Sequence, residues 1–113
     1  MSSKEEFAPK LQSIMSEIAV CEGLVLAKNS GEVIIGQTLT DMDHNSIAKN
    51  ISKIFKTKFD ALNKGKLVEM TLGLNDGYLL AVKNKNLMVL GFLGTDGKSS
   101  VGLLLRQLKN LMK

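Results

Sequence analysis

Two strand-like segments that are apolar on both faces constrain the fold of this chain most. Residues 78–82 read Tyr-Leu-Leu-Ala-Val and residues 87–93 read Leu-Met-Val-Leu-Gly-Phe-Leu, so neither alternates with polar residues. A strand of this kind needs an apolar layer on each side of its sheet. The turn residues 84–86, Asn-Lys-Asn, make the two segments antiparallel neighbours. The sequence therefore predicts an antiparallel sheet that lies between helical layers.

Periodicity along the chain predicts the other elements. Apolar residues recur at helical spacing over 4–19, 43–63 and 99–112, although Pro9 offers a later start of the first helix, at Ala8 or Pro9. Strands at 24–28 and 32–36 flank the turn Asn29-Ser30-Gly31, and a third strand covers 67–74. The predicted order is α-β-β-α-β-β-β-α, an α/β chain of the α+β type with five antiparallel strands. With 113 residues, it is expected to form a single domain over 1–113.

The strand at 67–74 differs from the two after it because only one of its faces is apolar. Its even-numbered residues, Val68 to Leu74, are all apolar, whereas the opposite face is half polar and carries Leu67, Glu69, Thr71 and Gly73. As the first strand of a meander it has an outer side that is an edge, and a long edge without Pro favours pairing with another chain. We favour self-pairing over the alternative, a solvated edge protected by Glu69.

Lysines form a stripe on the second predicted helix. The chain has 15 basic and 11 acidic residues, a net charge of +4, and Lys49, Lys53, Lys56 and Lys64 lie in one sector opposite the apolar arc. The stripe is either a solvated helix face or a docking surface for an acidic partner. Because Arg106 is the sole arginine and no aromatic platform accompanies the lysines, the sequence does not favour nucleic-acid binding.

No set of residues typical of catalysis, metal binding or cofactor binding is visible. His44 and Cys21 are the sole residues of their types, and Phe92 stands where a phosphate loop ending at Gly97-Lys98-Ser99 needs its first glycine. We interpret residues 94–100 as a turn with Ser99 as a helix cap; a weak anion site there is the alternative. The apolar runs are shorter than the ~20 residues of a membrane span. We expect a cytoplasmic protein with no catalytic residue, metal, cofactor or direct membrane insertion.

The chain resembles the Roadblock/dynein light chain family over nearly its whole length. The resemblance rests on the hairpin 23–34, the capped helix from Asp41 to Phe55, and the strands 67–74, 78–82 and 87–93. It implies a profilin-like, five-stranded antiparallel sheet and dimers in which the central helix and the third strand meet their counterparts. Members of the family bind small Ras-like GTPases, scaffold them on membranes, or act as dynein adaptors.

The residue patterns and the resemblance together give one functional hypothesis. A dimeric, non-catalytic regulatory or scaffold module binds a small Ras-like GTPase, and its second subunit is a copy of itself or a related Roadblock protein. The predicted dimer interface comprises Ile51, Ile54, Phe55, Lys58, Met70, Thr71 and Leu72, and the predicted partner-binding residues are Lys49, Lys53 and Lys56. The alternative is a structural adaptor of a dynein-like or membrane-associated complex, without effect on GTP turnover. A small profilin-like enzyme or ligand-binding domain is a third hypothesis.

Overall fold

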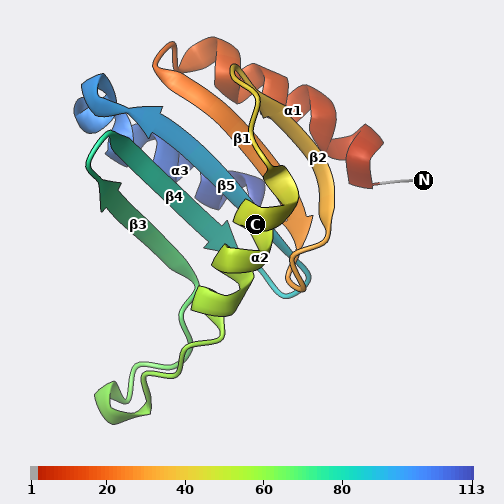
Figure 1. Ribbon diagram of the computed structural model, residues 1–113. Helices are drawn as coiled ribbons and strands as arrows, with labels where there is room; N and C mark the ends of the chain where they lie inside the picture. Colours follow the sequence, from red (N-terminus) through yellow and green to blue (C-terminus); the bar gives the residue numbers. More distant parts are fainter. Residues whose placement is uncertain (1–2) are drawn as a thin grey trace.

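The computed structural model describes residues 3–113 and contains the predicted five-stranded sheet between helices (Figure 1). Its helices are α1 (Ser3–Glu17), α2 (His44–Phe55) and α3 (Val101–Leu111), with short 3-10 turns η1 (Asp60–Leu62) and η2 (Thr95–Ser100). Its strands are β1 (Cys21–Lys28), β2 (Val33–Thr38), β3 (Glu69–Leu74), β4 (Gly77–Lys83) and β5 (Leu87–Gly94). They lie in the order β2-β1-β5-β4-β3, and every neighbouring pair is antiparallel.

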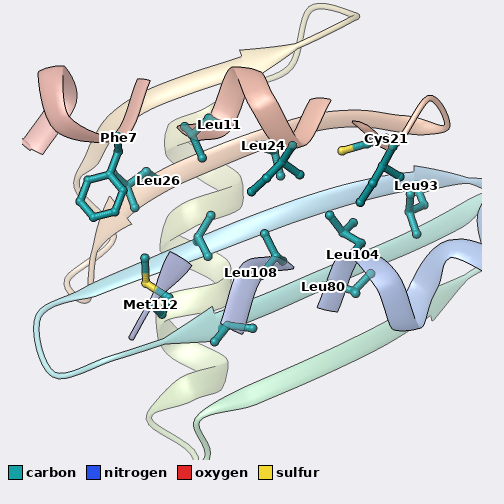
Figure 2. Close-up of a cluster of buried hydrophobic side chains, with 14 residues drawn as sticks. Phe7, Leu11, Cys21, Leu24, Leu26, Leu80, Leu93, Leu104, Leu108 and Met112 are labelled. Carbon is teal, nitrogen blue, oxygen red and sulfur yellow. The ribbon is translucent and has the colours of Figure 1, made fainter. Parts of the chain in front are cut away.

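The central strands bury side chains on both faces, which explains their continuous apolar sequences. On one face α1 and α3 pack against alternate residues of β1, β4 and β5, among them Leu24, Leu80 and Val89 (Figure 2). On the opposite face α2 supplies Ile51 and Phe55 to a second cluster. Alternating side chains of one strand therefore enter two different cores, and the predicted two-sided burial is confirmed.

The two faces are not covered equally. Two helices share one face, whereas α2 alone covers the other and lies over β1 and β2. The outer half of this face, toward β3, retains half-buried Met70 and Leu72, and Leu74 is 61% exposed. This half of the sheet therefore lacks a complete apolar cover in the protomer.

The second helix is shorter than the sequence predicts. The helix prediction is wrong for residues 56–63, because α2 ends at Phe55, where backbone bonds from Lys56 to Lys53 and from Thr57 to Ile54 close its last turn. Residues 56–66 are all exposed, so the continued helical spacing of apolar residues finds no surface to pack against in this protomer. We refer to residues 56–68 as the α2–β3 loop.

The outer helices also differ from the prediction at their starts. Ser99 is not the cap of the last helix, because it lies inside η2 and Ser100 precedes α3 without a side-chain capping bond. Pro9 lies within α1 rather than at its start, since burial of Phe7 and Leu11 holds both sides of the proline on the sheet. None of the helices in residues 3–113 is long and apolar enough to cross a membrane.

The tight turn between β3 and β4 depends on a glycine, and a second glycine serves as its control. Gly77 has φ +157°, and a Cβ there would collide with the backbone carbonyl of Leu93, whereas a Cβ at Gly102 meets nothing within 4 Å. We expect Gly77→Ala to lower the free energy of unfolding by about 2 kcal/mol or more. Gly102→Ala should raise it by up to ~1 kcal/mol because α3 gains a better helix former. Urea denaturation measures both; equal effects would contradict the backbone constraint.

Candidate functional site

The outer side of β3 is an open sheet edge. β3 is paired with β4 on one side, and no strand of residues 3–113 pairs with its other side (Figure 1). The backbone N–H of Lys83 donates to the carbonyl of Val68 at 3.0 Å, which places this opposed pair among the hydrogen-bonded positions of the ladder. By alternation, Glu69, Thr71 and Gly73 direct their backbone groups away from β4. The predicted edge strand is thus confirmed.

Glu69 does not guard this edge in the way that the alternative interpretation requires. Its carboxylate accepts an ion-pair contact from Lys109 of α3 at 3.1 Å, which draws the side chain over the α1/α3 face of the sheet. Both side chains are partly exposed, so the pair contributes little to stability. Its consequence is geometric, because the backbone of β3 is left accessible.

An apolar groove lies beside the open edge, between the start of α2 and the β3–β4 hairpin. Its volume is about 430 Å³. Met42 and Ile47 line the helix side, and Leu74, Leu79 and Phe92 line the sheet side. Met42, Leu79 and Phe92 were not predicted as site residues, because apolar periodicity does not show that one side of a core is open.

The structure divides the predicted interface residues into two groups. Ile51 and Phe55 contact the protomer's own sheet and are buried. Ile54 and Thr71 are exposed, and Met70 and Leu72 are half-buried at the β3 end of the α2 face. Lys58, which was predicted at the interface as part of the second helix, follows the end of α2 and is exposed in the α2–β3 loop.

The predicted partner-binding lysines all lie on the outer surface of α2 or at its C-terminus. Lys49, Lys53 and Lys56 are exposed. Ser52, which is buried on the inner side of the same helix, donates a 2.6 Å hydrogen bond to the carbonyl of Asn29 in the β1–β2 turn. This bond fixes α2 on the sheet and so holds the lysines outward.

Gly31 permits close approach of the same turn to α2. A Cβ at this glycine would lie 3.1 Å from the Cα of Lys49, and its φ of +98° also favours glycine. The β1–β2 turn therefore contacts the middle of α2 directly. Lys64, which the sequence places in the same stripe, lies instead in the α2–β3 loop.

His44 and Cys21, the residues considered as reactive groups, make contacts within the fold. Nε2 of His44 lies 3.0 Å from Oγ1 of Thr38, so the side chain joins the start of α2 to β2. Burial raises the pKa of the Cys21 thiol, and its Sγ donates a hydrogen bond to the Gly23 carbonyl. Within residues 3–113, no cluster of three or more histidine, cysteine or acidic side chains is arranged to hold a metal ion.

The turn before α3 does not suit an anion. A Cβ at Gly94 would meet the carboxylate oxygens of Glu22 and Asp96, at 2.6 and 3.2 Å. Two carboxylates at the entrance of this turn repel a negatively charged ligand. The structure therefore disfavours the anion site that the sequence left as an alternative.

Comparison with solved structures identifies the fold class. No protein-family model and no curated protein matches the chain. Among the similar solved structures, Myxococcus xanthus MglB has a TM-score of 0.79 and 10% sequence identity, over 96% of this chain and 90% of that chain. A Roadblock/LC7 domain from Streptomyces avermitilis has a TM-score of 0.71 and 12% identity, over 90% of this chain and 88% of that chain. Schizosaccharomyces pombe profilin has a TM-score of 0.65 and 8% identity, over 89% of each chain. The chain has the profilin-like α+β architecture. Within that class it has the Roadblock fold, as the sequence resemblance implied.

The N-terminal cap of α2 makes the stability of this surface depend on pH. Ser46 donates to Asp43 from its backbone N–H at 3.1 Å and from its hydroxyl at 2.9 Å, and these bonds lower the pKa of the Asp43 carboxyl. A lowered folded-state pKa stabilises the protein above the ordinary aspartate pKa, and this stabilisation is lost as the pH falls through the folded value.

We expect the melting temperature of the wild type to exceed that of Asp43→Asn at neutral pH, and the difference to shrink as the pH falls below the ordinary aspartate pKa of about 4. Asparagine caps the helix without titrating, so the comparison isolates the charge. Circular dichroism melts across this range measure the effect. Asp41→Asn, at an aspartate that does not cap α2, is the control; a difference that persists in acid would contradict the assignment.

Proposed function

We propose that this chain is a dimeric, non-catalytic regulatory module that binds a small Ras-like GTPase. The observation that carries the proposal is the open β3 edge beside an apolar groove, in a Roadblock fold. One neighbouring chain on this side of the molecule could both pair with the free strand edge and cover the exposed apolar surface.

A second copy of the chain is the partner that fits this side most simply. A twofold axis makes the β3 strands of the two copies antiparallel. The outward backbone groups of Thr71 in one copy then face β3 of the other copy. Pairing would join the two sheets and bring the α2 faces of both protomers together. Exposed Ile54 and Leu74, which are 38% and 61% accessible in the protomer, would then gain apolar neighbours.

The α2 lysines supply the second half of the proposal. Lys49, Lys53 and Lys56 point away from the protomer core, and a dimer would carry two copies of the stripe. A cationic surface of this kind steers an acidic partner and contributes to specificity more than to affinity. The module would influence the nucleotide cycle of a GTPase only through different affinities for its two nucleotide states.

The described residues favour a module that positions the residues of a GTPase over one that supplies a catalytic side chain. His44 is bonded to Thr38, the Cys21 thiol is buried, and Arg106 lies on α3, behind the sheet as seen from α2. Arg106 is therefore badly placed to insert beside a nucleotide that is held at the α2 surface. Stimulation of GTP hydrolysis would have to act through residues of the GTPase itself.

Self-pairing through β3 predicts a specific effect of proline. Thr71→Pro removes an N–H that points to the open edge, so it should abolish dimerisation while the β3–β4 ladder survives. Sedimentation equilibrium should give twice the chain mass for the wild type and the chain mass for the variant. A wild type that remains monomeric at high concentration would refute the dimer.

Leu72→Pro is the matched control for this experiment. Position 72 lies opposite Leu79 and directs its backbone N–H toward β4, so proline there should break the protomer's own ladder. We expect a loss of about 2 kcal/mol or more in unfolding free energy for Leu72→Pro, and a clearly smaller loss for Thr71→Pro. Dimerisation of Thr71→Pro at wild-type affinity would show that the dimer interface does not form through β3.

GTPase binding is tested by titrating the dimer with a small Ras-like GTPase in its GDP and GTP forms. The double variant Lys49→Glu/Lys53→Glu should weaken binding by at least about fivefold, mainly by slowing association. Lys98→Glu/Arg106→Glu makes the same change in charge away from α2 and should leave affinity unchanged. Negligible affinity for both nucleotide states defeats the proposal, and binding without any change in GTP turnover assigns the adaptor role instead.

A further inference from the structure

We propose that the α2–β3 loop is a docking element for the surface of an anionic phospholipid bilayer. This inference concerns residues 56–68, of which the dimer and GTPase arguments use only Lys56, at the start of the loop. It is independent of the proposed function, because it requires neither a second protomer nor a GTPase.

The loop projects from the body of the protein and carries apolar side chains into solvent. It extends past the end of α2, with η1 at its far end (Figure 1). Phe59 and Leu62, at the two ends of this turn, are 42% and 62% exposed. A projecting segment with two large apolar side chains can insert them at the boundary between lipid headgroups and acyl chains, at a depth of about 5–10 Å.

The same loop is strongly cationic. It contains Lys56, Lys58, Lys64 and Lys66 and a single carboxylate, Asp60, so its formal charge is four minus one, or +3. The three ion pairs found in residues 3–113 involve other lysines. These charges are therefore available to the headgroups of anionic lipids, which attract clusters of lysines near a membrane.

The loop also curls around a cationic hollow. This hollow has a volume of about 550 Å³ and lies between the loop and the end of β4. Lys56, Lys58 and Lys66 line it from the loop and Lys83 from β4, together with the ring of Phe55 and a single acidic residue, Asp60. Nζ of Lys83 lies 5.7 Å from the centre of that ring. Four ammonium groups around one hollow suit an acidic phospholipid headgroup.

The residue types favour a bilayer over an acidic protein. Steering of an acidic protein by lysines needs no exposed apolar side chains, whereas the loop places Phe59 and Leu62 beside its lysines. The loop has lysines alone, and their flexible point charges suit a fluid array of headgroups. Attachment of this kind reaches only the interface and is not a membrane span, and it replaces the sequence-based expectation of no direct membrane insertion.

Vesicle co-sedimentation of the full chain tests the proposal. The probes are vesicles of phosphatidylcholine alone and of phosphatidylcholine mixed with phosphatidylserine, at low and high salt. We expect binding to the anionic vesicles at low salt, weakened by added salt, and none to phosphatidylcholine. Equal binding to both compositions, or none to either, overturns the proposal.

Two variants separate the charged and apolar contributions. Lys58→Glu/Lys66→Glu should weaken binding by more than about tenfold, because each lysine near an anionic surface contributes about a fivefold factor. Phe59→Ser/Leu62→Ser should weaken it as well and leave residual binding that is more sensitive to salt. Lys98→Glu/Arg106→Glu is the charge-matched control and should bind as the wild type does; equal loss in this control overturns the proposal.

The competing occupant of the loop is another protein chain. Sedimentation in the absence of lipid shows whether Phe59→Ser/Leu62→Ser changes the oligomeric state. A serine variant that loses self-association but binds anionic vesicles normally would assign the loop to a second copy and overturn the membrane proposal. Thermal melts confirm that these exposed substitutions leave the fold intact, so loss of binding with an unchanged melt supports it.

Discussion

The structure depends on burying a sheet whose central strands are apolar on both faces. β1, β5 and β4 send alternating side chains into two separate cores, and each core needs its own helical cover. Leu80 and Leu90, from adjacent strands but opposite faces, are both fully buried. A three-layer arrangement is the direct physical consequence, and it determines which surfaces of the molecule remain open.

Unequal cover on the two faces produces the candidate functional surfaces. α1 and α3 together cover one face, whereas α2 is a single helix of 12 residues and lies over β1 and β2. The area toward β3 therefore keeps an apolar groove beside an unpaired strand edge. Because α2 ends at Phe55, the chain must then cross open space to reach β3, and this crossing becomes the exposed cationic loop.

Local sequence patterns predicted most of the fold and part of the candidate site. Turn residues such as Asn29-Ser30-Gly31 located the hairpins, and the half-polar pattern at 67–74 identified the edge strand. The helix prediction failed after Phe55 because helical spacing reports which residues could share a face, not whether a surface exists to receive them. The groove at Phe92 was missed for a related reason. An apolar residue that is covered on all sides and one that borders an open groove look alike in the sequence.

By itself, the sequence determined the order of elements, the two-sided burial of the central strands, the edge character of β3 and the basic character of the chain. These properties follow from periodicity and turn chemistry, which act between residues that are close along the chain. Only the tertiary structure decided where α2 ends, that Glu69 is drawn to Lys109 and away from the edge, and that Lys83 joins the loop lysines around one hollow. Those outcomes depend on how much of the sheet each helix covers, and this is a competition for surface among segments that are distant in sequence.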